Sequence, residues 1–113
     1  MEFDILRQRA IDIRRQYADL ERRRYGRAWT REEIALGFVG DVGDLAKLLL
    51  AEGGVRDIPD ARAGLAHELA DCLWSLLVLA DVHGVDLEPA FVATMDLLEQ
   101  HIRGQAAALD SEG

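Results

Sequence analysis

Residues 63–80 constrain the fold most, because they are apolar on almost every side when drawn as a helix. The only strongly polar members of this stretch are His67, Glu68, Asp71 and Ser75. A helix that is apolar all round is buried on nearly all sides. Its longest strongly apolar run, residues 72–80, is shorter than the about 20 residues that cross a bilayer. We therefore expect a central helix, packed within its own chain and against a partner chain, and no membrane contact.

Periodic apolar residues and helix-end signals predict three further helices around this one. The first helix carries apolar residues at spacings of three and four and ends before Gly26. The second begins at Thr30 with a Thr30-Arg31-Glu32-Glu33 capping box, and the central helix begins after Asp60 as N-cap. Pro89 lies in the first turn of the last helix. The predicted helices cover about residues 4–24, 30–52, 61–83 and 86–103.

Short connections between these four helices predict an all-α antiparallel four-helix bundle. The chain has 113 residues, which suits one domain over residues 1–104, with residues 105–113 as a frayed tail. A helical domain this small gains burial by pairing, so we expect a homodimer or a larger homo-oligomer.

Charge and cysteine content bear on compartment and partners. The chain has one cysteine, Cys72, so it forms no internal disulfide, and its N-terminus has no apolar signal core. Both features favour the cytoplasm. Residues 1–31 hold nine Arg against five acids, whereas residues 32–113 hold four basic residues against sixteen acids. The acidic part would repel nucleic acid and attract a divalent cation wherever several acids converge.

Four acids have a spacing that would allow such convergence. Asp41 and Asp44 share one face of the second helix, and Glu68 and Asp71 share one face of the central helix. Oxygen ligands of this kind suit Mg²⁺ or Mn²⁺. From the residues alone two interpretations stay open, a divalent-metal site or two solvated acidic faces. A di-iron site is disfavoured, because no His follows a Glu by three residues.

Two motifs around these acids resemble a known family. The segment Gly37-Phe38-Val39-Gly40-Asp41-Val42-Gly43-Asp44-Leu45-Ala46 resembles the LVGEVGELAE stretch of the MazG-like all-α nucleotide pyrophosphohydrolases, especially their dCTP pyrophosphatase branch. The segment His67-Glu68-Leu69-Ala70-Asp71-Cys72-Leu73 resembles the family's EELADVL. Residues 45–67 separate the two acidic pairs, within the family's range of gaps. The likeness extends over roughly residues 25–100.

The resemblance implies a fold, a reaction and a ligand set. It implies a MazG-like helical dimer or dimer of dimers that cleaves a nucleoside triphosphate, normal or deoxy, to the monophosphate and pyrophosphate with Mg²⁺, or alternatively Mn²⁺. Such an enzyme would clear nucleotides from the cellular pool. Asp41, Asp44, Glu68 and Asp71 would be the metal ligands and catalytic groups, and a metal-bound water would attack the α-phosphorus.

Several positions depart from the family pattern and motivate a second hypothesis. Both acids of the first motif are Asp rather than Glu, and Gly40 stands where some members carry the first of two Glu residues. Thr94 and Leu98 stand roughly where a Lys and an Asn often occur. The alternative is a catalytically impaired helical dimer that binds nucleotide or metal and acts in regulation.

Four residues are candidate substrate contacts, each with a plain structural alternative. Lys47 follows Asp44 by three residues and would hold a phosphate or form a surface ion pair with Asp44. Arg27 belongs to an arginine cluster that would steer polyphosphate or stay solvated. Tyr25 lies near the position of a base-stacking Trp in the resembled family, and Trp29 is close by. Either ring would stack on a base or fill the gap between the first two helices.

Overall fold

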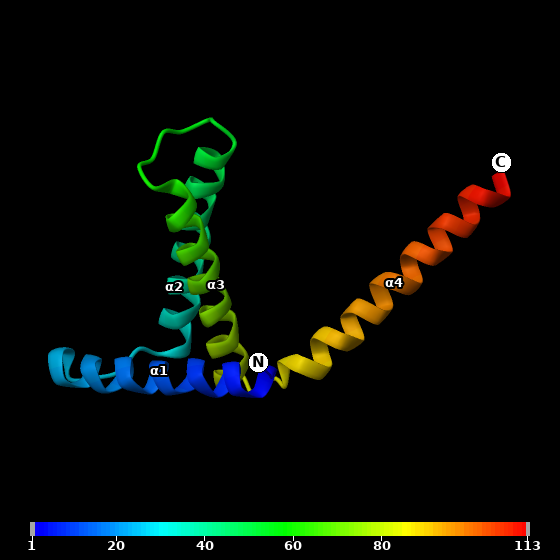
Figure 1. Cartoon of the computed structure of the whole chain (residues 1–113). Coiled ribbons are helices and arrows are strands. Elements are labelled where there is room, and N and C mark those ends of the chain that lie inside the picture. Colours follow the sequence, from blue (N-terminus) through cyan, green and yellow to red (C-terminus); the bar gives the residue numbers. More distant parts are fainter. Residues whose placement is uncertain (1, 113) are drawn as a thin grey trace.

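The computed structural model describes residues 2–112 and consists, over that range, of four α-helices without a β-strand. They are α1 (Phe3–Tyr25), α2 (Arg31–Glu52), α3 (Ala61–Val82) and α4 (Leu87–Glu112) (Figure 1). The all-helical prediction is confirmed, and the first three helices begin and end within a few residues of their predicted bounds.

Local chemistry explains most of these helix ends. Gly26 adopts a left-handed φ of 81° and its N–H bonds to the Arg22 carbonyl, which ends α1. The predicted capping box at the start of α2 is confirmed: Glu33 N–H donates to Thr30 Oγ1 (3.2 Å) and Thr30 N–H donates to Glu33 Oε1 (3.0 Å). The expectation for Asp60 was only partly right. Asp60 precedes α3, but it adopts a left-handed φ of 53° and its side chain makes no capping bond.

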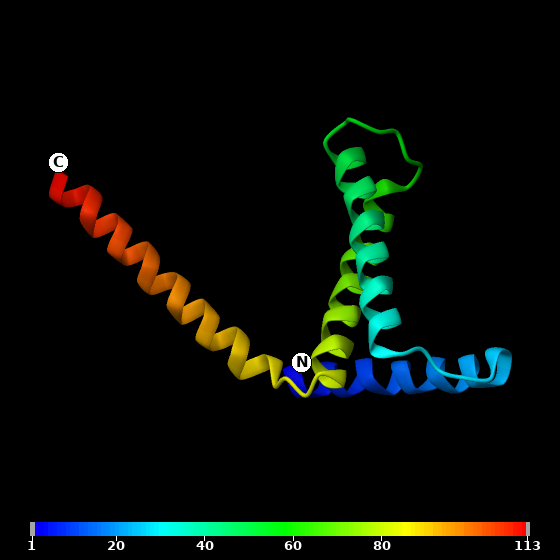
Figure 2. The same cartoon turned by 180° about the vertical axis from the view of Figure 1, so that it is seen from behind.

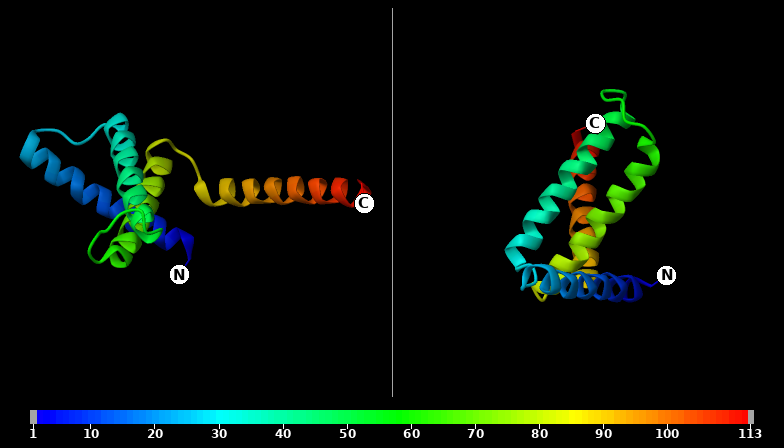
Figure 3. Two further views of the ribbon diagram at one scale, coloured as in Figure 1. Left: turned by 90° about the horizontal axis from the view of Figure 1, so that it is seen from above. Right: turned by 90° about the vertical axis from the view of Figure 1, so that its left-hand side faces the viewer.

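The main packing between helices involves α1, α2 and α3. α2 and α3 form a hairpin of neighbouring, oppositely directed helices, and α1 crosses its foot, against α3 (Figures 1 and 3). Trp74 of α3 donates from Nε1 to the Ala10 carbonyl of α1 (3.0 Å), and its ring lies 5.8 Å from that of Tyr17. Among the described residues, the small buried apolar core comes from α1 and α3, and consists of Ala10, Ile11, Leu65, Leu77 and Val78.

The apolar composition of α3 predicts a helix that is buried on nearly all sides, and the single chain buries only part of it. Leu65, Leu77 and Val78 are buried, yet Leu69, Leu73 and Leu76 of the same helix remain exposed in the single chain. By length and composition alone α3 would also qualify to cross a membrane, with a mean hydropathy of 1.4 in its most apolar window. The core helix of a soluble protein meets the same test.

The last helix stands apart from the other three. α4 points away from the α2–α3 hairpin in Figure 2 and in the left panel of Figure 3, and over the described residues it has no extensive packing against another helix. The four helices of one chain therefore do not close around a common core. As a result the radius of gyration is 18.8 Å, whereas a compact domain of this length has about 13 Å.

The C-terminal tail corrects one sequence expectation. We predicted that the last helix ends near Arg103 and that residues 105–113 fray, but α4 continues to Glu112, and residue 113 lies outside the described residues. Gly104 lies inside it at a cost of about 1 kcal/mol. The run Gln105-Ala106-Ala107-Ala108-Leu109 consists of strong helix formers, and these carry the helix past the glycine.

Candidate functional site

Two of the four predicted carboxylates lie close together on α3, and a third, Asp41 of α2, is bonded to the same helix. Glu68 and Asp71 lie on one face of α3 beside His67, with one potential ligand atom of each residue within 4.8 Å of the others. His67 Nε2 is 3.2 Å from Asp71 Oδ2. Asp41 of α2 faces α3 and accepts a hydrogen bond from Ser75 Oγ of that helix (2.6 Å).

The Cys72 thiol of α3 is influenced by acids of both α2 and α3. Burial raises the pKa of this thiol, and the negative charges of Asp41, Glu68 and Asp71 raise it further. One acid of α2 and two acids of α3 therefore act electrostatically on the same thiol. A divalent cation would relieve the repulsion between Glu68 and Asp71, and carboxylate oxygens suit Mg²⁺, although the close group on α3 also includes an imidazole nitrogen of His67.

Asp44 lies differently from the other three predicted ligands. Its side chain is 57% exposed and its carboxylate is 3.9 Å from Lys47 Nζ on the same helix. The surface pair that we considered for Lys47 is thus formed, and both side chains face solvent in the single chain. The structure brings Glu68 and Asp71 together beside His67 and turns Asp41 toward the same helix, whereas Asp44 pairs with Lys47.

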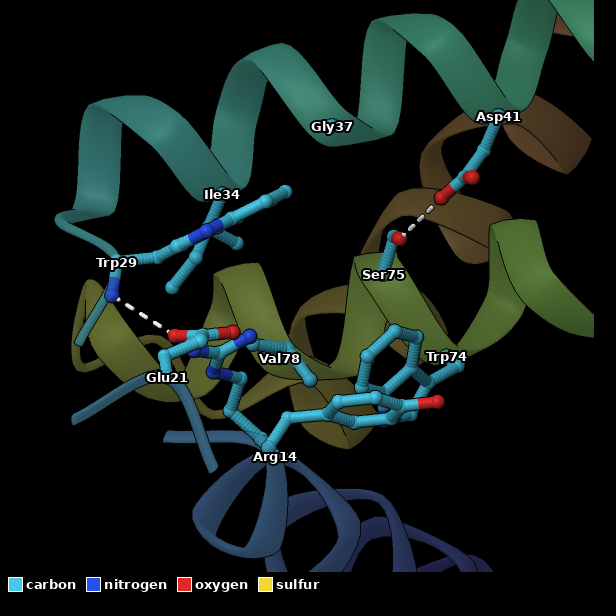
Figure 4. A pocket seen from close by; sticks show the side chains of 10 residues that line it. Arg14, Glu21, Trp29, Ile34, Gly37, Asp41, Trp74, Ser75 and Val78 are labelled. Carbon is cyan, nitrogen blue, oxygen red and sulfur yellow. Dashed lines mark hydrogen bonds and ion pairs between the residues drawn. The ribbon is translucent and has the colours of Figure 1, made fainter. Parts of the chain in front are cut away.

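A cavity of about 320 Å³ opens beside Asp41. It lies where α1, the α1–α2 loop, α2 and α3 meet, and its lining includes Trp29 and Trp74 (Figure 4) and a third aromatic side chain, Tyr17. Asp41 and Ser75 lie at one end of it. The remaining lining residues are Arg14, Glu21, Ile34, Gly37 and Val78.

Trp29 is held in this wall by its neighbours. Its backbone N–H donates to Glu21 Oε1 (2.9 Å), and the guanidinium carbon of Arg14 lies 5.9 Å from the centre of its ring. Glu21 is only 9% exposed and forms an ion pair with Arg14. A Cβ atom built on Gly37 would lie 3.0 Å from the Trp29 ring, so glycine is what lets the indole approach α2 so closely.

Of the four predicted substrate contacts, Trp29 is the one that lines this cavity. Tyr25 is 72% exposed at the end of α1, and Lys47 pairs with Asp44. Arg27 pairs with Glu33 (Nη1 to Oε1, 2.5 Å). The pKa of Glu33 is lowered to about 2, mainly by this hydrogen bond from Arg27 and to a smaller extent by the one from the Thr30 N–H. Arg27 therefore supports the start of α2.

Arg14 and Glu21 were missed by the sequence reasoning. Both lie on α1 among many other charged residues, and seven positions separate them, which places them on one helix face about two turns apart. That spacing gives only a weak signal, because nothing local shows that the α1–α2 loop folds back to cover them.

Neither a protein-family model nor a curated protein matches this chain. The likeness to the MazG-like enzymes thus rests on the two acidic motifs and their spacing.

Proposed function

We propose that the protein is a Mg²⁺-dependent nucleoside triphosphate pyrophosphohydrolase of the MazG-like type, acting in the cytoplasm. The observation that carries the proposal is that Asp41 lines one end of an aromatic cavity, while Glu68 and Asp71 lie together on the neighbouring helix α3. Cation ligands and a base-sized apolar cavity side by side are what a nucleotide with a phosphate chain requires.

The aromatic cavity is the proposed base site. Tyr17, Trp29 and Trp74 offer ring faces on which any base stacks, an interaction worth about 1–3 kcal/mol per base. Asp41 lines the same cavity, so a base held there directs its phosphates toward the acids.

Asp41, Glu68 and Asp71 would hold the cation, with Asp44 joining them if its side chain turns from Lys47. When bound, Mg²⁺ neutralises the carboxylates and polarises the phosphate oxygens. One carboxylate accepts a proton from water as the water oxygen bonds to the α-phosphorus. The bond from that phosphorus to the oxygen bridging to the β-phosphorus breaks, and pyrophosphate leaves with the bonding electrons.

Assembly into a homodimer, or a dimer of dimers, is part of the proposal. The chain exposes 8491 Å², whereas a compact monomer of 12.6 kDa exposes about 6,200 Å². The excess of about 2,300 Å² per chain is of the size that obligate homodimers bury. Apolar side chains of α4 contribute to it, among them Phe91, Leu97 and Ile102, each at least 59% exposed. Docking of α4 on a partner chain would complete an antiparallel bundle.

One observation favours the second candidate, a nucleotide- or metal-binding regulatory dimer without turnover. Asp44 faces solvent and pairs with Lys47, so the structure does not bring all four predicted carboxylates together in the single chain. Binding needs fewer ligands in place than catalysis does, because turnover depends on the orientation of the attacking water.

Pyrophosphate release decides between the two candidates. Purified protein is incubated with a panel of ribo- and deoxyribonucleoside triphosphates and Mg²⁺ or Mn²⁺. We expect release that is lost in Asp71→Asn and kept in Asp57→Asn, a control that removes an exposed acid from the α2–α3 loop. Nucleotide binding without release above the Asp71→Asn background would refute the enzymatic proposal and support the regulatory one.

A further inference from the structure

Ser75 is a buried polar residue in the middle of an apolar helix. It is 6% exposed, and its hydroxyl donates to Asp41 Oδ2 at 2.6 Å, from α3 to α2 (Figure 4). The other side-chain hydrogen bond between these helices in the described chain, from Arg62 to Glu52, lies exposed at the loop end of the hairpin. The Ser75–Asp41 bond is therefore the part-buried polar link of the α2–α3 interface.

The choice of partner is informative, because a helical hydroxyl has an easier one. Ser and Thr side chains within helices commonly bond the carbonyl four residues earlier. Thr94 does so with Ala90 (2.8 Å) and Ser111 with Ala107 (3.0 Å). Ser75 instead donates to a carboxylate on another helix, which makes a shorter, charge-assisted bond.

That bond constrains the carboxylate in a useful way. An ionised carboxylate has about four lone-pair sites, and Ser75 occupies one of them on Oδ2. Among the described residues no hydrogen bond to Oδ1 is found, which leaves that oxygen available to a cation. Asp41 reaches less far than the Glu of the resembled motif, so its two side-chain torsions must be well defined if it is to reach a cation held by Glu68 and Asp71. Partners that orient a ligand in this way commonly change metal affinity 10–100-fold.

We propose that Ser75 is a positioning residue, which orients the Asp41 carboxylate so that it binds a divalent cation together with Glu68 and Asp71. The inference rests on the proposed metal site but does not require turnover.

The test measures Mn²⁺ binding to the full chain without nucleotide, from the electron paramagnetic resonance signal of free Mn²⁺. We expect Ser75→Ala to weaken binding about tenfold or more. Ser75→Thr keeps the hydroxyl and should recover much of the loss. Thr94→Ala removes a hydroxyl that bonds only its own helix and should leave the affinity unchanged.

Two comparisons separate positioning from packing. Leu77→Ala removes buried volume from the same helix, so it should lower the stability to urea without a comparable loss of Mn²⁺ affinity. In an Asp41→Asn background, Ser75→Ala should add little to the loss already present, because its effect passes through Asp41. This second comparison stands even if Ser75→Thr fails to fold.

Each adverse outcome points to a different error. A wild-type chain that binds no Mn²⁺ overturns the metal site and the positioning role together. Wild-type binding that Ser75→Ala leaves unchanged overturns the positioning role alone. The same holds for an equal loss in Leu77→Ala, or for a full-sized effect of Ser75→Ala in the Asp41→Asn background.

Discussion

Replacing Glu21 tests the account of how Trp29 and the cavity are held. Glu21 is 9% exposed, forms an ion pair with Arg14 and accepts the Trp29 N–H. The two side chains of the pair are only 11% and 14% exposed, so removal of one leaves a largely buried charge without a partner. Breaking such a pair costs about 3–5 kcal/mol, a large share of the about 5–15 kcal/mol that keeps a domain folded.

We therefore expect Glu21→Ala to lower the free energy of unfolding by about 3–5 kcal/mol. Glu21→Gln keeps an acceptor for the Trp29 N–H and loses the charge, so its cost should be smaller, about 1.5–3 kcal/mol. Urea unfolding at fixed protein concentration, followed by tryptophan fluorescence, measures both. Fluorescence is well suited because both Trp residues of the chain, Trp29 and Trp74, line the cavity.

The matched control is an exposed ion pair on the same helix. Asp19 pairs with Arg23 at 3.0 Å, but the two side chains are 53% and 76% exposed. Asp19→Ala should therefore cost no more than about 0.5 kcal/mol. A Glu21→Ala variant that is no less stable than Asp19→Ala would refute the reasoning, because it would mean that the charge of Arg14 is solvated without its partner.

Three more predictions concern separate parts of the chain. Gly37→Ala places a Cβ 3.0 Å from the Trp29 ring, so we expect the indole to shift, its fluorescence to change and the affinity for a triphosphate to fall by several-fold; an unchanged emission spectrum would contradict this. The folded-state pKa of Glu33 is about 2 against an ordinary 4.5, so its bond to Arg27 stabilises the fold above pH 4.5 and is lost as pH falls toward 2. Arg27→Gln should lower the urea midpoint of unfolding at pH 7. The difference in midpoint between this variant and wild type should shrink as the pH falls from 4.5 toward 2, and a difference that does not change with pH would contradict the role given to the Glu33–Arg27 bond. Light scattering at micromolar protein concentration should give at least twice the 12.6 kDa mass of one chain. Phe91→Glu on α4 should shift the protein toward monomer. A wild-type protein that is monomeric would refute the proposed assembly.

Much of the secondary structure could be predicted because the signals that determine it are local. The Thr30–Glu33 capping box and the glycine at position 26 act within four residues of where they stand, so they identify the ends of helices without knowledge of the fold. The prediction was wrong past Gly104, where one unfavourable residue was given more weight than the favourable residues that follow it.

The site was predictable only in outline. Spacing placed Glu68 and Asp71 on one face of their helix, and the structure has them there beside His67. Spacing treated Asp41 and Asp44 as equivalent, whereas the structure turns Asp41 toward Ser75 and leaves Asp44 with Lys47. Two residues three apart differ in direction by about 60° around a helix, so the angle at which the neighbouring helix packs decides which of them meets it.

By itself, then, the sequence determined four helices, an apolar third helix and two acidic faces, because these depend on residues within about one turn of each other. The tertiary structure alone decided that Glu21 is buried and paired with a part-buried Arg14 next to Trp29, that Asp41 is bonded to Ser75, and that α4 lies largely apart from the other described helices. These features depend on the path of the α1–α2 loop and on how the helices cross. Such geometry is settled by side-chain packing between distant segments, and no local pattern in the chain encodes it.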